Sequence, residues 1–318
     1  MKAPQFWFEP TNWQAKSLLP LAALFWLGGF LRRLLTRAYR AKIPVICIGN
    51  IIAGGAGKTP TCIAIANFLL QQEANPVFVT RGYGGSVCGP LRVDPTIHIA
   101  SQVGDEALLL ARIAPTWISR NRAAGIKAAE AEATHIIMDD GLQNPTVKPS
   151  MAFLVMDGAV GIGNGLIIPA GPLRETLHSA EKRIDGIILI GSSDVQGIGT
   201  KTYSPVMHAR ILPDLSDDFP KDAKFFAFAG IGRPEKFYQT CSDAELNLVG
   251  TTDFPDHHTF TENELLQLEQ KAQAAEAKLL TTEKDWVRLP PTWQTKIATL
   301  PIKLVFDIPE LPRSFLKG

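Results

Sequence analysis

Hydrophobic residues in the first two thirds of the chain alternate between short continuous runs and longer stretches with helical spacing. The short runs, such as Val45 to Ile48, carry β-branched residues, which is typical of strands buried on both faces of a sheet. We predict strands at 45–48, 77–80, 117–119, 135–138, 153–156 and 187–190. The predicted helices between them cover 62–69, 106–113 and 121–133; in the first, the apolar positions follow the i, i+3, i+4, i+7 spacing. This alternation predicts an α/β fold with a mostly parallel, helix-flanked sheet that binds ligands at the carboxyl ends of its strands.

The same alternation begins again after a Ser- and Gly-rich stretch at 192–204, which we interpret as a connection. Beyond it, the pattern predicts strands at 224–229, 246–251, 278–281 and 302–306, and helices at 234–241 and 262–275. A length of 318 residues favours two packed units over one core. The predicted organisation is therefore an N-terminal region at 1–42, a larger α/β domain at 43–199 and a second, smaller α/β domain at 200–318.

The N-terminal region contains an apolar run at 18–31 without a single charge. Fourteen helical residues reach about 21 Å, which is less than the roughly 30 Å of bilayer hydrocarbon, so we expect no full span. The charges follow the run and no small-residue cleavage site appears, which argues against a signal peptide. Two helical faces are predicted beyond the run, one apolar and one basic: Leu31, Leu34, Leu35 and Ala38 against Arg33, Arg37 and Arg40. The pattern predicts a helix lying in the interface of an anionic membrane; the alternative is a buried helix that caps the domain.

A glycine-rich turn joins the first predicted strand to the first predicted helix, and it reads Gly-Gly-Ala-Gly-Lys-Thr. Strand, glycine loop, Lys-Thr and helix in this order are the context of a phosphate-binding P-loop. Glycines let backbone N–H groups surround an anion, Lys58 is suited to neutralising phosphates, and the Thr59 hydroxyl is suited to binding Mg²⁺. The residues predicted to hold the nucleotide are Ile52, Ala53, Gly54, Gly55, Ala56, Gly57, Lys58 and Thr59. The usual first glycine of the motif is replaced by Ile52, so an ordinary glycine-rich turn is the alternative.

Two further groups of residues are candidates for chemistry. Asp139 and Asp140 follow an apolar strand, as the Mg²⁺-binding carboxylate of a P-loop enzyme does, and Asp139 is the predicted ligand. Asp105 stands at a helix start, where simple N-capping is the alternative role. His257 and His258 precede a predicted helix in the second unit; they suggest a metal site only weakly, and a surface loop is the alternative.

Composition narrows the classes of function. The net charge is +1, so the chain lacks the strong overall positive charge that is typical of nucleic-acid-binding proteins, and no nucleic-acid partner is expected. The four cysteines show no C-x-x-C pairing, so they predict no zinc framework and are typical of reduced cytosolic residues. No feature of the chain indicates a protein partner.

These motifs together resemble those of the tetraacyldisaccharide 4'-kinases, the lipid A 4'-kinases of Gram-negative bacteria. The resemblance covers nearly the whole chain, including the basic, apolar N-terminus, and the deviant P-loop also fits the family. The matching segments are 49–50 with the P-loop, Arg81-Gly82-Tyr83-Gly84, 104–106, 139–143, 169–175, 254–258 and 281–285.

The resemblance implies a membrane-associated kinase that transfers the γ-phosphate of ATP, with Mg²⁺, to the 4'-hydroxyl of tetraacyldisaccharide 1-phosphate. Such an enzyme works at the cytoplasmic leaflet of the bacterial inner membrane, as a peripheral or monotopic protein. The resemblance implies that Asp105 is the general base, with His257 as its partner, and that Lys58 is a catalytic cation. It also implies that Glu175 lies near the metal, beside Thr59 and Asp139. Arg174 would have a phosphate or structural role, and Arg81 and Tyr83 would lie near the acceptor.

Two other classes of protein share part of this pattern. Membrane-associated ATPase switches of the partitioning type also use a deviant glycine-rich loop, but their loop carries an extra lysine where this chain has Ala53. A non-enzymatic nucleotide-binding scaffold is the third class, and the retained Lys58, Thr59 and Asp139 argue against it.

Overall fold

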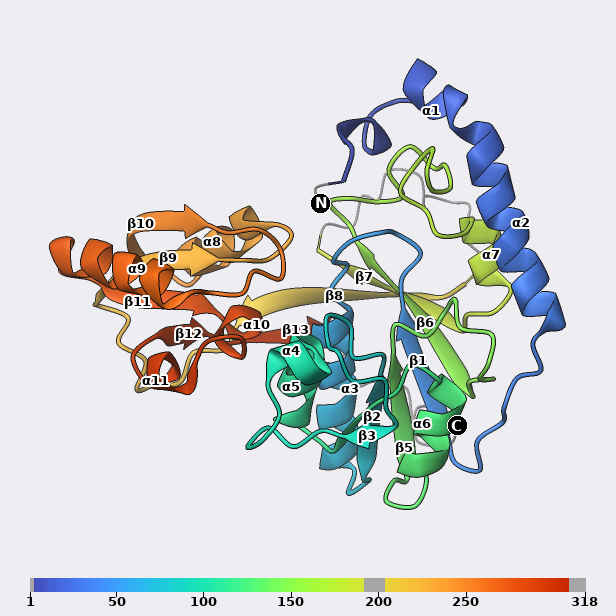
Figure 1. Cartoon of the computed structure of the whole chain (residues 1–318), viewed down its shortest axis with the longest axis horizontal. Coiled ribbons are helices and arrows are strands. Elements are labelled where there is room, and N and C mark those ends of the chain that lie inside the picture. Colours follow the sequence, from blue (N-terminus) through green and yellow to red (C-terminus); the bar gives the residue numbers. More distant parts are fainter. Residues whose placement is uncertain (1–2, 192–203, 309–318) are drawn as a thin grey trace.

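The computed structural model describes residues 3–191 and 204–308, so the connection predicted at 192–204 lies almost entirely outside the described residues. The described chain forms two sheets (Figure 1). The larger has nine strands in the order β13-β8-β7-β6-β1-β5-β2-β4-β3. Its strands are β1 (Val45–Gly49), β2 (Pro76–Thr80), β3 (Leu91–Arg92), β4 (Thr116–Ile118), β5 (His135–Asp139), β6 (Met151–Asp157), β7 (Gly186–Ile190), β8 (Val206–Pro213) and β13 (Ile302–Phe306).

The larger sheet is mostly parallel, as predicted. Strand β1 lies between β5 and β6 and is parallel to both, while β3 and β13 are the antiparallel edge strands. Parallel neighbours end at the same edge of a sheet. The residues that follow β1, β2, β5 and β6 are therefore gathered at one edge, where the candidate chemistry of the sequence lies.

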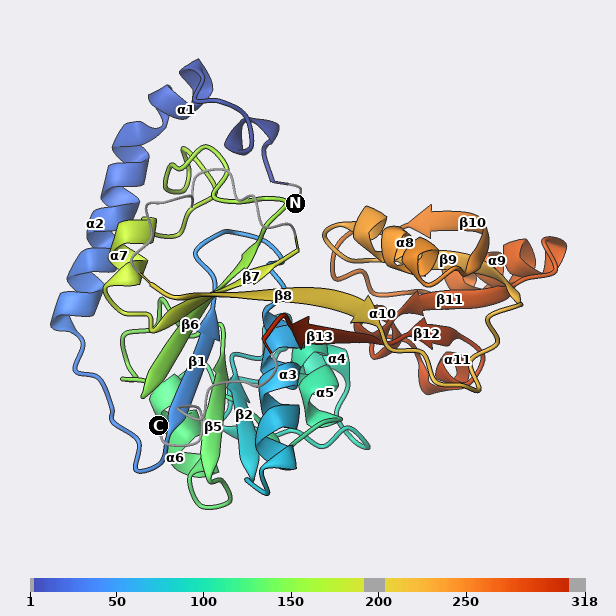
Figure 2. The same cartoon turned by 180° about the vertical axis from the view of Figure 1, so that it is seen from behind.

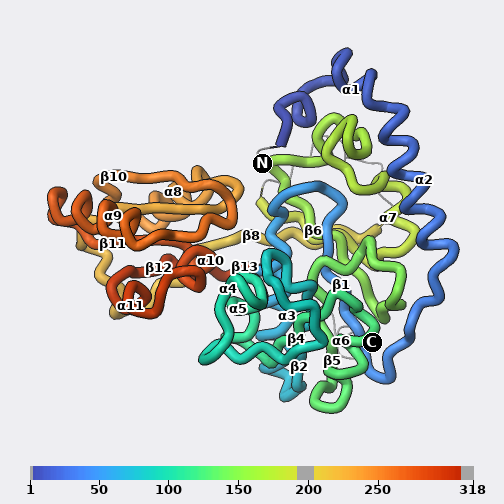
Figure 3. The backbone as a smooth tube through the Cα atoms, viewed as in Figure 1, coloured from blue at the N-terminus to red at the C-terminus, as the bar shows by residue number. Residues whose placement is uncertain are grey.

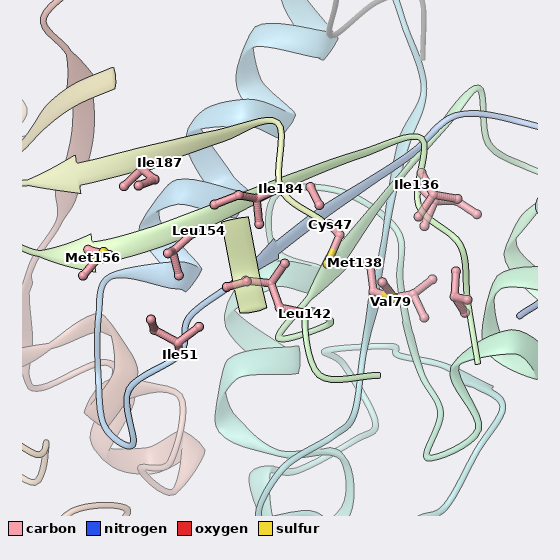
Figure 4. Packing of buried hydrophobic residues seen from close by; sticks show 14 of the residues in the cluster. Cys47, Ile51, Val79, Ile136, Met138, Leu142, Leu154, Met156, Ile184 and Ile187 are labelled. Carbon is pink, nitrogen blue, oxygen red and sulfur yellow. The ribbon is translucent and has the colours of Figure 1, made fainter. Parts of the chain in front are cut away.

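Helices cover both faces of this sheet because successive strand residues point to opposite sides. Val45 and Cys47 pack with α6 (Arg122–Ala129) and α7 (Leu177–Glu181), and Figure 4 shows part of this apolar layer. Ile46 and Ile48 pack instead with α3 (Lys58–Gln71) and α5 (Asp105–Ala111). The predicted apolar face of α3 is confirmed, since its four members are fully buried: Cys62, Ile65, Ala66 and Leu69.

The N-terminal segment forms η1 (Gln5–Trp7), α1 (Trp13–Ser17) and the long helix α2 (Leu19–Leu35), which runs along the outside of the larger unit (Figure 1). Ala22 is the only buried residue of α2, so the alternative of a buried helix is wrong. Its exposed large apolar side chains are Leu19, Leu21, Leu24, Phe25, Trp26, Leu27, Phe30, Leu31, Leu34 and Leu35. Among the described residues, no helix has the length and apolar character to cross a bilayer.

The helix ends earlier than its apolar pattern predicts. Thr36 is its C-cap and has extended backbone angles. The helix therefore does not include Arg37, Ala38 or Arg40. The prediction that its apolar and basic faces continue through these residues is wrong. Tyr39 instead forms a bridge with Val147 of the larger unit, which fixes the chain that follows the helix.

The smaller sheet has four parallel strands in the order β10-β9-β11-β12. The strands are β9 (Lys224–Ala229), β10 (Asn247–Asp253), β11 (Lys278–Thr282) and β12 (Ala298–Leu300), and the helices are α8 (Pro234–Asp243), α9 (Glu262–Ala274), α10 (Glu283–Trp286) and α11 (Pro291–Gln294). Buried side chains fill both faces, with Phe228 against α9 and Phe225 against α8. The smaller unit therefore has a core of its own.

Two strands of the range 200–318 belong to the larger sheet, which corrects the boundary predicted at residue 200. Strand β8 pairs in parallel with β7, and β13 pairs with β8 along Ile302 to Phe306. The chain passes between the two units along these strands, outward by β8 and back by β13 (Figures 2 and 3). This double connection holds the smaller unit beside the edge where the central strands end.

Candidate active site

The glycine-rich loop follows β1 and leads directly into α3. Gly57 is the N-cap of α3 and has a φ of +86°, a left-handed conformation that favours glycine. A Cβ atom at Gly57 would also lie 2.4 Å from the Ile190 Cδ1 atom at the end of β7. Asn50, which is fully buried, donates hydrogen bonds to the carbonyls of Ile52 (2.8 Å) and Gly54 (3.2 Å). No local pattern explains Asn50 in physical terms; the structure shows that it shapes the loop.

Lys58, the first residue of α3, turns its ammonium group toward two oxygens of the larger unit. Its Nζ lies 3.4 Å from Asn50 Oδ1 and 3.7 Å from Asp140 Oδ1. Asp140 also binds Arg174, whose Nη1 is 3.1 Å from both carboxylate oxygens. Burial raises the pKa of Asp140, but the charges of Lys58 and Arg174 outweigh it and hold this pKa below its usual value. The structure thus places Arg174 on a carboxylate beside the P-loop lysine.

Asp139 ends β5, and its carboxylate is almost completely buried. Its two hydrogen-bond contacts are long: 3.4 Å from Thr80 Oγ1 and 3.8 Å from Cys62 Sγ. Burial, and then the nearby charge of Glu106, raise the pKa of Asp139 to about 7, although Lys58 opposes this rise. A buried carboxylate in this situation is one that a divalent cation would return to its ionised form.

The part of the chain that the structure describes holds no cluster of three or more His, Cys, Asp or Glu side chains placed to bind a metal. Mg²⁺ at phosphate sites commonly takes one or two protein oxygens together with phosphates and water, so such a cluster is not required. Asp139 and Thr59, which follows Lys58 at the start of α3, fit this kind of site.

Glu175 is held by donor side chains from three different segments. Its buried carboxylate accepts hydrogen bonds from Arg33 of α2 (2.7 Å), from Arg183 and from Gln143 (3.0 Å). Burial raises the pKa of Glu175, but its partners, led by Arg183, outweigh it and hold this pKa low. Two guanidinium groups neutralise Glu175, which ties the N-terminal helix to the larger unit, and its predicted place near the metal stays a prediction. No local pattern signals this role for Arg33 or Arg183.

Asp105 is the first residue of α5, and its side chain does not cap that helix. The N-cap is Gly104, whose φ is +90° and where a Cβ atom would lie 2.4 Å from the Tyr83 carbonyl oxygen. N-capping as the alternative role of Asp105 is therefore wrong. Its Oδ1 accepts the N–H of Glu106 (2.9 Å), and its Oδ2 lies 2.9 Å from His257 Nδ1.

This contact joins the two units, since α5 belongs to the larger one and His257 follows β10 of the smaller one. The side chain of Asp105 is 3% exposed and that of His257 is 29% exposed, so solvent reaches the pair mainly at the His257 ring. Burial raises the pKa of Asp105, but the hydrogen bond from His257 and the charges of Lys284, His257 and Arg288 outweigh it. The pKa of Asp105 therefore lies below its usual value.

The two adjacent histidines have different surroundings. His258 Nε2 lies 3.0 Å from the Glu264 carboxylate, and the ring stacks on Phe254 with centroids 4.9 Å apart. The His257 ring is instead 5.4 Å from the ring of Tyr83, which is 63% exposed. The weak suggestion of a metal site formed by both histidines is therefore wrong. Arg81, the residue after β2, is exposed, and its predicted place near an acceptor stays a prediction.

Other ion pairs link the two units around this pair. Lys284 Nζ lies 3.3 Å from Glu106 Oε1, and Arg233 and Lys236 of the smaller unit both bind Asp157 at the end of β6. Sequence reasoning did not find Asp157, which carries no motif that sets it apart from other strand ends. The P-loop edge of the larger sheet is thus faced by the smaller unit through several charged contacts.

Comparison with known proteins identifies the family of this chain. The family model described as Tetraacyldisaccharide-1-P 4'-kinase (LpxK) matches residues 14–317. This chain belongs to that family. Its relatives include the tetraacyldisaccharide 4'-kinases of Parvibaculum lavamentivorans, 44% identical over 98% of this chain and 96% of that protein, and of Paramagnetospirillum magneticum, 45% identical with the same shares covered.

A solved member of the tetraacyldisaccharide-1-P 4'-kinase family supports the fold. The structure of LpxK from Aquifex aeolicus in complex with ATP matches with a TM-score of 0.76 and covers 95% of this chain and 97% of that one, at 23% identity. The α/β, P-loop kinase fold and the resemblance drawn from the motifs are both confirmed. Family membership also gives no support to the partitioning-type ATPase or to a non-enzymatic scaffold.

Proposed function

We propose that this chain is an ATP-dependent lipid kinase of lipid A biosynthesis. It transfers the γ-phosphate of ATP to the 4'-hydroxyl of tetraacyldisaccharide 1-phosphate and so forms lipid IVA. The single observation that carries the proposal, beside the family, is the contact of Asp105 and His257 across the two units, at 2.9 Å. Such a pair provides a base that can be held for an acceptor hydroxyl, which phosphoryl transfer to an alcohol uses.

In this mechanism the backbone N–H groups of the P-loop and the N-terminus of α3 hold the phosphates, and Lys58 neutralises their charge. Asp105 Oδ2 takes the proton of the 4'-hydroxyl as that oxygen attacks the γ-phosphorus, the bond from the γ-phosphorus to the bridging oxygen breaks, and ADP leaves. His257 orients the carboxylate through its Nδ1. Because the pKa of Asp105 lies below its usual value, the carboxylate is ionised at neutral pH and ready to accept a proton.

We propose that Thr59 and Asp139 hold a Mg²⁺ ion with the phosphates. When bound, this ion would offset negative charge on the β- and γ-phosphates. The support from this chain is the buried Asp139 carboxylate, with its long hydrogen bonds and its pKa raised to about 7.

We propose further that the exposed apolar side chains of α2 lie in the cytoplasmic leaflet of the bacterial inner membrane, with the protein peripheral or monotopic. So many exposed apolar side chains are unusual on a helix that faces water, and they fit a helix that lies in the membrane interface. The lipid acceptor is dissolved in the same membrane. Arg81 and Tyr83 are the residues we propose on the acceptor side, Tyr83 because its ring lies beside His257. We propose no nucleic-acid or protein partner.

The proposal is tested by incubating the protein with ATP labelled in the γ-phosphate, the disaccharide acceptor in detergent micelles, and Mg²⁺. We expect label in the lipid fraction, in amounts that depend on the acceptor. Lys58→Ala is the matched control, because it removes the phosphate-neutralising charge and leaves the Asp105–His257 contact in place. Release of inorganic phosphate at the same rate with and without acceptor, and no labelled lipid, would overturn the kinase in favour of an ATPase.

A further inference from the structure

Arg288 lies just after α10 in the smaller unit, and its guanidinium group is buried, with a side chain that is 6% exposed. It donates four hydrogen bonds. Nε donates to the Lys284 carbonyl (3.1 Å), Nη1 to the His258 carbonyl (3.0 Å), and Nη2 to the Gly230 carbonyl (3.0 Å) and to Asp285 Oδ1 (2.7 Å). A planar, rigid fork of donors is what distinguishes arginine from lysine, and here it spans three separate segments of the smaller unit.

These contacts enclose the backbone of His257. The Gly230 carbonyl that accepts from Arg288 also accepts the N–H of His257 (3.0 Å), and the His258 carbonyl is held from the other side. His257 itself has a φ of +59°, a left-handed conformation that is uncommon for a residue with a side chain. Such a conformation persists where the surrounding contacts determine it, and Arg288 binds both the carbonyl that accepts the His257 N–H and the carbonyl of His258.

The same guanidinium group faces Asp105 across the two units. Arg288 Nε lies 3.4 Å from Asp105 Oδ2, which is also the oxygen that contacts His257 Nδ1. The charged groups around Asp105 are His257, Arg288 and Lys284 from the smaller unit and Glu106 from its own helix. Apart from His257 itself, Arg288 is the one of these that contacts both the carboxylate and the loop of the histidine.

We propose that Arg288 is a positioning residue for the proposed phosphoryl transfer, fixing the His257 loop with its fork of donors and placing its charge on Asp105. The inference rests on the proposed function. Arg288 contributes in two ways. Its hydrogen bonds maintain the geometry of the His257–Asp105 pair, which affects kcat, and its positive charge lowers the pKa of Asp105. A residue with a merely structural role would change neither the pH profile nor kcat in a folded protein.

The test uses the full-length protein and the lipid-labelling assay, with kcat, KM and kcat/KM measured across the acidic side of the pH profile. Arg288→Gln should lower kcat roughly ten- to a hundredfold, because a misplaced pair loses much of the contribution of a general base. It should also move the acidic limb of kcat/KM upward by about one pH unit, since removing a neighbouring positive charge raises the pKa of a carboxyl. Arg288→Lys should keep the limb near its wild-type position, because the charge remains, but should still lower kcat, because the fork is lost.

Arg112→Gln is the matched control. Its guanidinium stacks on Trp286, 4.6 Å from the ring centroid, close to the contact between the units but without a hydrogen bond to the His257 loop. We expect wild-type kcat and an unchanged acidic limb for it. ATP affinity, measured by equilibrium binding, should equal that of the wild type in all three variants, because none of these residues belongs to the P-loop.

The outcomes separate this inference from the proposed function. If the wild type labels no lipid, the proposed function fails, and the inference falls with it. If the wild type labels lipid but Arg288→Gln, folded and with normal ATP affinity, has a wild-type kcat and acidic limb, the inference alone fails. Should Arg288→Gln not fold, Arg288→Lys decides: a wild-type kcat in that variant overturns the role of the fork.

Discussion

The pairing of Asp105 with His257 predicts that their mutations are strongly non-additive. Asp105→Asn keeps the shape of a buried side chain while removing the base, and His257→Ala removes the 2.9 Å contact to it. If His257 acts through Asp105, its loss should matter little once the base is gone. The double variant should then be almost as active as Asp105→Asn alone.

The expected sizes follow from the contacts. A general base contributes about 10²- to 10⁴-fold, so Asp105→Asn should lower kcat by this factor, or about 3–5 kcal/mol of transition-state stabilisation. His257 donates one hydrogen bond to a charged, buried group, which is worth about 1.5–3 kcal/mol. His257→Ala should therefore lower kcat roughly ten- to a hundredfold. The double variant should lie within about threefold of Asp105→Asn.

The assay is the steady-state transfer of labelled phosphate to the lipid at saturating ATP and acceptor, together with equilibrium binding of ATP to each variant. ATP affinity should survive in all of them, because neither residue belongs to the P-loop. His258→Ala is the control: its ring binds Glu264 and stacks on Phe254, so its loss should lower thermal stability more than kcat. Fully additive losses of kcat, or a larger effect of His258 than of His257, would refute the pairing.

Three further predictions concern the P-loop and the N-terminal helix. Lys58→Ala should lower kcat at least about a hundredfold in steady-state assays, because it removes the cation beside the phosphates; near wild-type turnover would contradict the P-loop assignment. Leu24→Ser should weaken sedimentation with anionic vesicles roughly tenfold, since an exposed leucine of α2 contributes about 1.5–3 kcal/mol when buried in lipid. The control Leu70→Ser, at an exposed leucine of α3, should bind vesicles like the wild type. Equal losses of vesicle binding in the two variants would show that α2 is not the membrane anchor. Arg33→Ala should lower the free energy of unfolding in urea by about 1–3 kcal/mol, because it strips a buried carboxylate of one partner; the neighbouring Arg32→Ala should not, and equal effects would argue against the ion pair.

Much of the fold could be predicted from neighbouring residues, because the period of apolar positions reports how a segment is buried. The strand at 45–48 and the helix face at 62–69 are examples, and both are buried as expected. The membership of β8 and β13 in the larger sheet could not be predicted in this way. Sequential elements usually pack beside each other, so the sequence predicts that a strand at 302–306 joins the unit formed by the residues before it. Its partner is β8, where Phe306 pairs with Ala209.

The sequence by itself determined the proposed phosphate site, because its strand, glycines, Lys58 and helix are adjacent in the chain and local backbone geometry shapes the loop between them. Only the tertiary structure decided which partners the other charged residues have. Asp105 and His257 are 152 residues apart, and Arg33 and Glu175 are 142 residues apart. A local sequence pattern cannot predict a contact between residues so far apart in the chain. From their neighbours alone, either carboxylate could equally have capped a helix or held a metal. Their roles follow from the folded chain, in which β8 and β13 hold one unit against the other and α2 lies along the larger unit.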